Sequence, residues 1–255
     1  MPVRCSGSTV AAVTRAKLWL LGAGPGAPDL LTVRAARALA DADIVVWGRA
    51  LMADALVDEH AREGAERVPW PPATMEDIHT VYDRARDEDL VVARLLWGDP
   101  AIYGSLRDEV REARARGLDY EVVPGVSAFS AAAAALGIEL TRAPQTGPSL
   151  VLTAPSAPEQ LRDFASHGAT IAIFMAGARG EELQRELLLG GYAPQTGCAV
   201  VHRVTRDGEL VVTCRLDALA ATLVSPDLDR HTLVLVGAAL DADAGADDAN
   251  AGEAA

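Results

Sequence analysis

The chain has 255 residues, of which 50% are hydrophobic and 23% are charged. This composition supplies enough apolar material for one large or two small globular domains, and it excludes a disordered, collagen-like or coiled-coil protein. The formal net charge of −13 argues against a nucleic-acid partner, because lysine and arginine have to neutralise a phosphate backbone.

Metal sites, disulfide frameworks and membrane spans are also disfavoured. Three scattered cysteines, Cys5, Cys198 and Cys214, are too few for a disulfide framework or a cysteine-rich zinc site, and the five histidines show no ligand spacing. We therefore expect no metal ion. The longest apolar run, residues 171–178, is far too short to cross a bilayer. We expect a cytoplasmic protein with a small-molecule substrate and no membrane partner.

Residues 17–138 alternate between short apolar runs and helical patterns, which predicts an α/β lobe with a mainly parallel sheet. The predicted strands are Leu18–Leu21, Ile44–Trp47, Leu90–Leu95 and Tyr120–Val123. The predicted helices are Leu31–Ala40, Met75–Arg86, Ile102–Arg116 and an alanine-rich helix that ends at Gly137. Thr74 and Asp77 have capping-box spacing, and Asp99 and Ser127 are candidate N-caps.

A polar segment at residues 139–148 contains two prolines and a glycine and is the predicted linker. Residues 149–240 then predict a second α/β lobe with a mixed sheet, in which Asp207-Gly208 forms a hairpin turn. Residues 1–16 are an expected flexible extension. Residues 241–255 are an acidic tail that cannot bury enough apolar surface to order itself. The second-lobe strands are predicted at Leu150–Thr153, Thr170–Met175, Cys198–Arg203, Leu210–Thr213 and Thr232–Val236, and its helices at Pro158–Ser166, Gly180–Leu188 and Leu216–Val224.

The first candidate ligand loop follows the first strand. Gly22, Gly24 and Ala27 fit the dinucleotide-binding pattern G-x-G-x-x-[GA], which suggests an NAD(P)-dependent oxidoreductase. However, Pro25 removes an N–H that a phosphate would use, and the second strand ends in Gly48-Arg49 rather than in an acid for the ribose. A tight turn without a ligand and a loop that contacts another ligand both remain open.

Two further loops end strands at the edge where open α/β sheets bind ligands. In residues 94–104, Gly98 lets a ligand approach the backbone, whereas Asp99 either contacts the ligand or only caps a helix. Arg94 has apolar neighbours and, if buried, would need a partner. In residues 123–129, Phe129 breaks the G-x-S-x-G pattern, so Ser127 is interpreted as a cap and ligand contact rather than a nucleophile.

Taken in order, these segments resemble the tetrapyrrole methylase family, which uses S-adenosylmethionine (SAM). Residues 22–32 are similar to its G-x-G-P-G-D-P-x-L-L-T, and residues 94–104 to its R-L-x-x-G-D-P-x-x-Y-G. Residues 121–128 and 232–237 are similar to its E-V-V-P-G-V-S-S/A and T-x-x-L-V-G. The resemblance runs from about Lys17 to Leu240. Within the family it is greatest to the methyltransferases that act on carbon 11 of precorrin-4 in corrin (vitamin B12) synthesis.

The resemblance implies two α/β lobes with SAM in the cleft between them, and a homodimer. The residues that it implies as SAM contacts are Pro25, Gly98, Asp99, Pro100, Ile102, Tyr103, Ser127, Ala128, Met175, Arg203 and Thr232. It also matches Arg94 to the motif arginine, the candidate catalytic residue, which would orient an anionic or enamine-like acceptor. Arg49 and Arg142 are candidate partners for substrate carboxylates. Methyl transfer from a sulfonium requires no metal.

Two departures from the family pattern bear on the substrate. Ala27 stands where the family usually has Asp, and Thr153-Ala154-Pro155 replaces an arginine and a longer loop. These departures leave two alternatives open: a methyltransferase that acts on a smaller, non-tetrapyrrole acceptor in a natural-product pathway, and a SAM-binding protein without catalysis.

Overall fold

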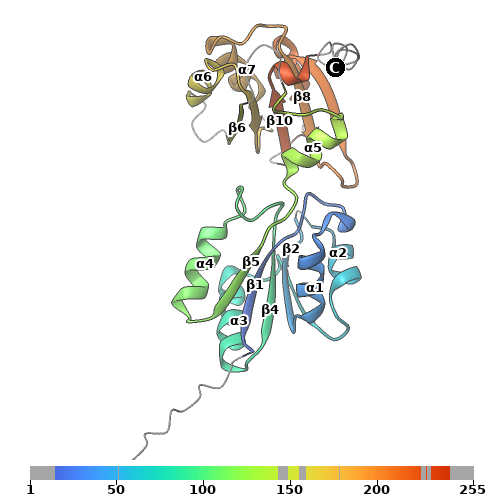
Figure 1. Ribbon diagram of the computed structural model, residues 1–255, viewed down its shortest axis with the longest axis vertical. Coiled ribbons are helices and arrows are strands. Elements are labelled where there is room, and N and C mark those ends of the chain that lie inside the picture. The colour runs from blue at the N-terminus through green and yellow to red at the C-terminus, as the bar shows by residue number, and fades with distance from the viewer. Residues whose placement is uncertain are drawn as a thin grey trace, which may run out of the picture.

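The computed structural model describes residues 15–50, 52–142, 149–154, 159–177, 179–224, 228 and 231–241. These residues form two five-stranded sheets, each covered by helices, in two lobes that are stacked end to end (Figure 1). The predicted fold class is confirmed. No helix in the described ranges is both long and apolar enough to cross a membrane.

The first sheet is entirely parallel and has the strand order β3-β2-β4-β1-β5. Its strands are β1 (Lys17–Gly22), β2 (Ile44–Gly48), β3 (Glu66–Trp70), β4 (Val91–Leu96) and β5 (Asp119–Val123). Helices α1 (Val33–Asp41) and α2 (Asp54–His60) cover one face, and α3 (Met75–Asp87) and α4 (Leu106–Ala115) cover the other. The sequence did not predict β3 or α2.

The first residues of helices α3, α4 and α5 show which of the predicted N-caps form. The capping box of α3 is confirmed, because the Asp77 N–H donates to Thr74 Oγ1 at 3.2 Å and the Thr74 N–H donates to Asp77 Oδ2 at 2.7 Å. Helix α4 begins at Leu106 rather than Ile102, so the prediction that Asp99 caps it is wrong. Ser127 is the N-cap residue of α5 (Ala128–Leu136), as predicted, although its side chain makes no capping hydrogen bond.

The second sheet is mixed and has the order β6-β7-β10-β8-β9. Its strands are β6 (Leu150–Thr153), β7 (Thr170–Ile173), β8 (Gly197–His202), β9 (Leu210–Arg215) and β10 (Thr232–Val236). The antiparallel strands β8 and β9 form the hairpin predicted around Asp207-Gly208, and Gly208 has a φ of +77° in its connecting loop, residues 203–209.

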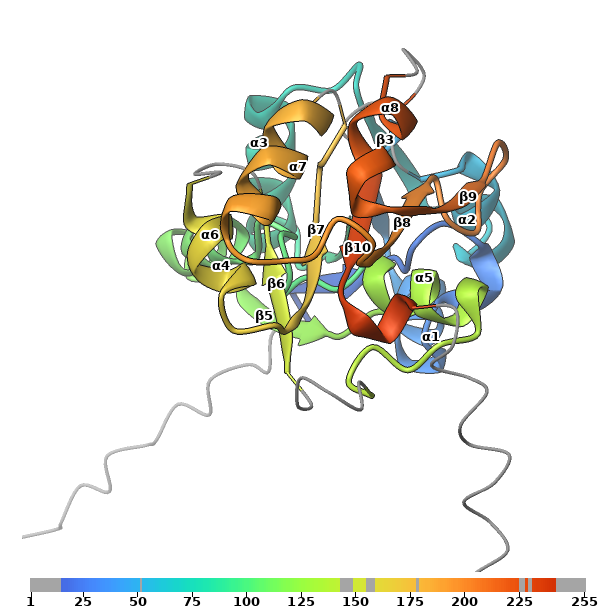
Figure 2. The same cartoon turned by 90° about the horizontal axis from the view of Figure 1, so that it is seen from above.

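Helices cover both faces of this sheet. Helices α6 (Gln160–Ala165), α7 (Gly180–Leu189) and α8 (Leu219–Thr222) pack on one face. Helix α5, which enters from the first lobe, packs on the other face (Figure 2). Short 3-10 helices lie at Pro28–Leu30, Leu216–Ala218 and Ala238–Leu240. The predicted boundaries of the lobes, linker and tails stay predictions, since residues 1–14, 143–148 and 242–255 lie outside the described part of the chain.

Candidate functional site

Three loops at the carboxyl ends of β1, β4 and β5 meet backbone to backbone. Gly24 and Gly98 form an isolated antiparallel bridge with N···O distances of 3.2 and 3.0 Å. A Cβ atom on Gly22 would lie 2.5 Å from the Gly125 nitrogen, and a Cβ on Gly125 would lie 2.1 Å from the Gly98 carbonyl oxygen. Only glycine permits these approaches, so the glycine pattern has a packing cause here.

The Asp99 carboxylate ties two of these loops together. Its Oδ1 accepts from the Ala101 N–H at 2.8 Å, and its Oδ2 accepts from the Gly125 N–H at 3.1 Å. A carboxylate that accepts backbone N–H groups makes stronger hydrogen bonds than a neutral acceptor does. Asp99 therefore fixes the position of the β5 loop relative to the β4 loop.

The strand ends of the second sheet bring together three of the residues predicted to bind SAM: Met175, Arg203 and Thr232. Met175 and Arg203 have φ angles of +55° and +51° just after β7 and β8. Thr232 opens β10 and is 1% exposed; its backbone oxygen accepts from the Ala176 N–H at 2.9 Å. Its hydroxyl lies 3.0 Å from Nδ1 of His202, its register partner on β8.

The loops of the first lobe lie against these strand ends. The Tyr103 ring centroid is 4.9 Å from that of Phe174, and the Ala27 N–H donates to Thr205 Oγ1 at 3.0 Å. Among the described residues, six non-glycine residues have positive φ angles, and five of them lie in these loops and strand ends: Tyr103, Ser105, Met175, Arg203 and Thr205. Backbone strain of this kind concentrates at ligand sites, so the meeting point of the lobes is the candidate site for a ligand.

The geometry at this point fits a cofactor bound mainly through backbone groups. A Cβ built on Gly98 would make ordinary van der Waals contacts, the nearest at 3.7 Å to Ser127 Cα and Val126 O, so one further atom fits on this side of Gly98. Tyr103 and Met175 are 48% and 46% exposed and offer apolar surface. Of the other residues predicted to bind SAM, Pro25 and Ile102 are partly exposed in the same loops, and Pro100 is buried beneath Gly104.

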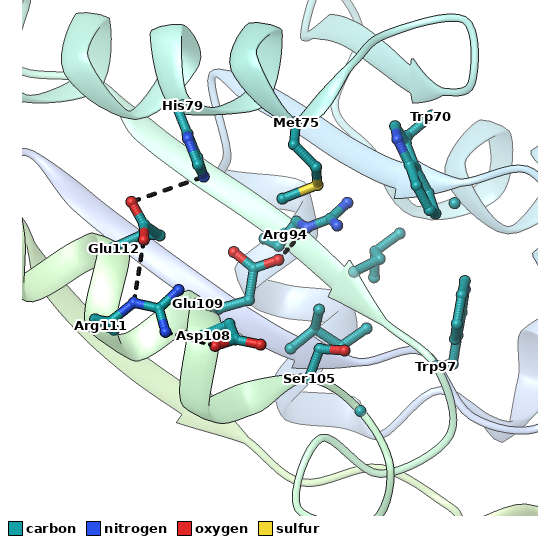
Figure 3. Close-up of a pocket in the computed structure, with 14 residues that line it drawn as sticks. Trp70, Met75, His79, Arg94, Trp97, Ser105, Asp108, Glu109, Arg111 and Glu112 are labelled. Carbon is teal, nitrogen blue, oxygen red and sulfur yellow. Dashed lines mark hydrogen bonds and ion pairs between the residues drawn. The ribbon is translucent and has the colours of Figure 1, made fainter.

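A cavity of about 340 Å³ lies beside these loops, between α3 and α4 (Figure 3). Arg94 of β4 lines it and is only 7% exposed. Its Nε donates to Glu109 Oε1 of α4 at 3.0 Å, which confirms that a buried arginine here has a partner. The other carboxylate oxygen of Glu109 accepts from the Tyr82 hydroxyl of α3 at 2.7 Å.

The two arginines predicted to bind substrate carboxylates lie elsewhere. Arg49 follows β2, and its guanidinium is engaged by the Asp54 carboxylate, with Nε 3.0 and 3.1 Å from the two oxygens. Arg142 is exposed beyond α5, next to residues 143–148. Their roles toward a substrate stay predictions. No group of three or more histidine, cysteine, aspartate or glutamate side chains within the described ranges could hold a metal ion.

The sequence reasoning missed Glu109, Tyr82 and Thr205. A signal for Glu109 exists, because it stands between Leu106 and Val110 on the apolar face of α4, where a charged residue requires a buried partner. No comparable signal marks Thr205, since its contact with Ala27 joins residues 178 positions apart.

Comparison with known proteins gives concordant results. The family model of the Tetrapyrrole (Corrin/Porphyrin) Methylases matches residues 17–220. The chain is 33% identical to a cobalt-precorrin-4 C(11)-methyltransferase of Methanocaldococcus jannaschii, with 88% of each chain covered. It is 34% identical to a precorrin-4 C(11)-methyltransferase of Pseudomonas aeruginosa, with 90% of this chain and 93% of that one covered.

Solved structures agree with these relatives. An X-ray structure of a cobalt precorrin-4 methyltransferase, described as a cobalamin biosynthetic enzyme, has a TM-score of 0.81 at 32% identity and covers 89% of this chain and 97% of that one. A uroporphyrin-III C-methyl transferase of Thermus thermophilus, complexed with S-adenosylhomocysteine, has a TM-score of 0.70 at 29% identity and covers 87% of this chain and 97% of that one.

Proposed function

Because the chain belongs to the tetrapyrrole (corrin/porphyrin) methylases, we propose that it is a SAM-dependent methyltransferase of corrin biosynthesis that methylates a precorrin-4-like precursor at carbon 11. The observation that carries the proposal is the similarity to precorrin-4 C(11)-methyltransferases over about nine-tenths of both chains. The TM-score of 0.81 to a cobalt precorrin-4 methyltransferase supports it further.

SAM supplies an electrophilic methyl group on a sulfonium, so the protein has to hold donor and acceptor in line and exclude water. We assign the cofactor to the meeting point of the lobes. Gly98, Ser127 and Ala128 would face it from the first lobe, and Met175 from the second. The buried Thr232 would support the site from beneath, because its backbone oxygen holds the Ala176 N–H. The Asp99 bonds to Ala101 and Gly125 would keep these loops in place before the cofactor binds.

Arg94 is proposed to act on the acceptor rather than on the cofactor. Its guanidinium is a donor only and stays charged, so it does not accept the proton that the acceptor carbon loses. It orients an anionic or enamine-like acceptor by electrostatic attraction. The ion pair with Glu109 satisfies one side of the guanidinium and keeps the charge compensated within the lobe.

The alternative functions have less support. An NAD-dependent oxidoreductase would need an acid after β2, where the chain has Gly48-Arg49, and an NADP-dependent one would need an arginine free to bind the 2′-phosphate, whereas Arg49 is paired to Asp54. A smaller acceptor was suggested by Ala27 and by the short loop after Thr153. Ala27 contributes its N–H to the contact with Thr205, and residues 155–158 of that loop lie outside the described part of the chain. The relatives named for precorrin-4 favour the tetrapyrrole.

We also propose that the protein is a cytoplasmic homodimer, as the family resemblance implies. Light scattering on the purified chain would give twice the mass of one chain. A single-chain mass at micromolar concentration would contradict the dimer.

Ligand binding and turnover test the proposed function. SAM and S-adenosylhomocysteine should raise the melting temperature, whereas NADPH should not, because only a bound ligand stabilises the folded state. Labelled methyl should then pass from SAM to precorrin-4 in preference to smaller acceptors. SAM binding without transfer to any acceptor would favour a non-catalytic protein, and stabilisation by NADPH alone would favour an oxidoreductase.

A further inference from the structure

Glu109 forms the centre of a buried three-residue chain that links α3, α4 and β4. It is 4% exposed, and each of its two carboxylate oxygens has one partner: Arg94 Nε at 3.0 Å and the Tyr82 hydroxyl at 2.7 Å. Burial is the main cause that raises the pKa of Tyr82 well above its ordinary value, and the nearby Glu109 charge is the second. The tyrosine hydroxyl therefore remains a hydrogen-bond donor. The carboxylate is thus held from the α3 side and faces Arg94 on the β4 side.

This arrangement leaves one donor of Arg94 without a partner among the described residues. Its Nη1 is buried and has no hydrogen-bond partner among the described residues, and the side chain lines the cavity between α3 and α4. A buried N–H without an acceptor is costly in a folded protein and is often explained by an absent ligand or water. Since arginine only donates, the missing partner has to be an oxygen or another acceptor atom.

The cavity walls show what kind of group fits. Trp70 and Trp97, whose ring centroids are 6.4 Å apart, stand at one end, and the Met75 thioether lies over Arg94 (Figure 3). At the other end His79 lies 3.7 Å from Glu112. Asp108, Arg111 and Glu112 also line the cavity, and Arg111 is ion-paired to both carboxylates. The apolar walls at the tryptophan end, with the Arg94 guanidinium beside them, suit part of a flat ring that carries a carboxylate or carbonyl oxygen.

We propose that Glu109, held by Tyr82, is a positioning residue that presents Nη1 of Arg94 to an oxygen of the acceptor in this cavity. The inference rests on the proposed function, since it places part of the acceptor between α3 and α4. Glu109 also lines the cavity, and its effect on the acceptor is exerted through Arg94.

A double-mutant comparison tests this role. The variants are Glu109→Gln, Tyr82→Phe, Arg94→Gln and the double variant Arg94→Gln/Glu109→Gln. The matched control is Glu186→Gln, because Glu186 is also 4% exposed and ion-paired, to Arg162 and Arg185 in the second lobe. For each variant we would measure acceptor kcat and KM, the S-adenosylhomocysteine Kd, and the binding of the octacarboxylate porphyrin uroporphyrin III by tryptophan quenching.

We expect Glu109→Gln and Arg94→Gln each to lower acceptor kcat/KM by about 100-fold, the size typical of a misplaced orienting group. The double variant should be no worse than Arg94→Gln alone. The S-adenosylhomocysteine Kd should stay within about twofold of wild type, because the hydrogen bonds of Arg94 and Glu109 run to each other and to Tyr82 rather than to the cofactor loops. Tyr82→Phe should show a smaller loss of acceptor kcat/KM, and Glu186→Gln should show none.

Two results would overturn the inference. The first is wild-type kinetics in Glu109→Gln. The second is a double variant whose loss of acceptor kcat/KM equals the product of the two single losses, as a merely structural role of Glu109 predicts. If Glu109→Gln does not fold, the same comparison with Tyr82→Phe decides. If the wild type transfers no methyl, the proposed function fails, and porphyrin binding still decides the inference, which requires weaker binding in Glu109→Gln than in Glu186→Gln.

Discussion

Replacing Asp99 with alanine should loosen the site more than its partly exposed position suggests. The change removes two charge-assisted hydrogen bonds, from the Ala101 and Gly125 N–H groups. Hydrogen bonds to a charged group contribute about 1.5–3 kcal/mol each when buried, and solvent screening here reduces that, so we expect unfolding to become easier by about 1–3 kcal/mol in total.

The larger effect should be on the cofactor. Without the carboxylate, the β5 loop loses its tie to the β4 loop, and Gly98 and Ser127 no longer keep a fixed separation. We expect the S-adenosylhomocysteine Kd to rise at least about tenfold, or 1.4 kcal/mol, by isothermal calorimetry. Asp99→Asn retains one accepting oxygen, so its S-adenosylhomocysteine Kd should lie between that of the wild type and that of Asp99→Ala. An unchanged Kd in Asp99→Ala would refute the idea that this carboxylate organises the binding loops.

The remaining predictions concern packing, turnover, thiol chemistry and capping. Gly125→Ala should abolish S-adenosylhomocysteine binding, because its Cβ would lie 2.1 Å from the Gly98 oxygen; normal binding in calorimetry would contradict the close approach. Arg94→Ala should cut kcat far more than SAM affinity, and equal losses of both would count against its role toward the acceptor. A hydrogen bond from the Cys198 thiol, with help from the Thr222 hydroxyl, lowers the pKa of Cys214 to about 6, so its alkylation rate, followed by peptide mass spectrometry, should be flat above pH 7 and fall below pH 6. A rate that still climbs from pH 7 to 9 would refute this lowering. Thr74→Ala should cost about 1 kcal/mol in urea unfolding through the lost capping box, and no change would mean that the cap adds nothing.

The central elements of the fold are predictable from sequence because their signals are local. Strands β1, β2 and β4 are apolar runs, buried on both faces, and the turn-rich loops between them mark where each ends. Strand β3 has no such signal. It is an edge strand with alternating charge, and it contains Pro69, which lowers its strand propensity. Helix α2 has only seven residues, too few for a clear period.

The site is predictable only in part, because its geometry depends on packing. The glycine motifs indicate the ligand-binding edge of the first sheet. They do not reveal that Tyr103 and Ser105 adopt left-handed conformations, which delays α4 to Leu106 and frees Asp99 to bridge two loops. Likewise, a buried Arg94 requires an anion, but the choice of Glu109 follows from how α4 lies on β4.

Product analysis with carbon-13-labelled SAM tests the central claim most directly. Purified protein would be incubated with methyl-labelled SAM and precorrin-4, and the product examined by nuclear magnetic resonance. We predict one new labelled methyl signal on carbon 11 of the macrocycle, absent when Arg94→Ala protein is used for the same time. An unlabelled macrocycle, or a label on another atom, would contradict the proposed function.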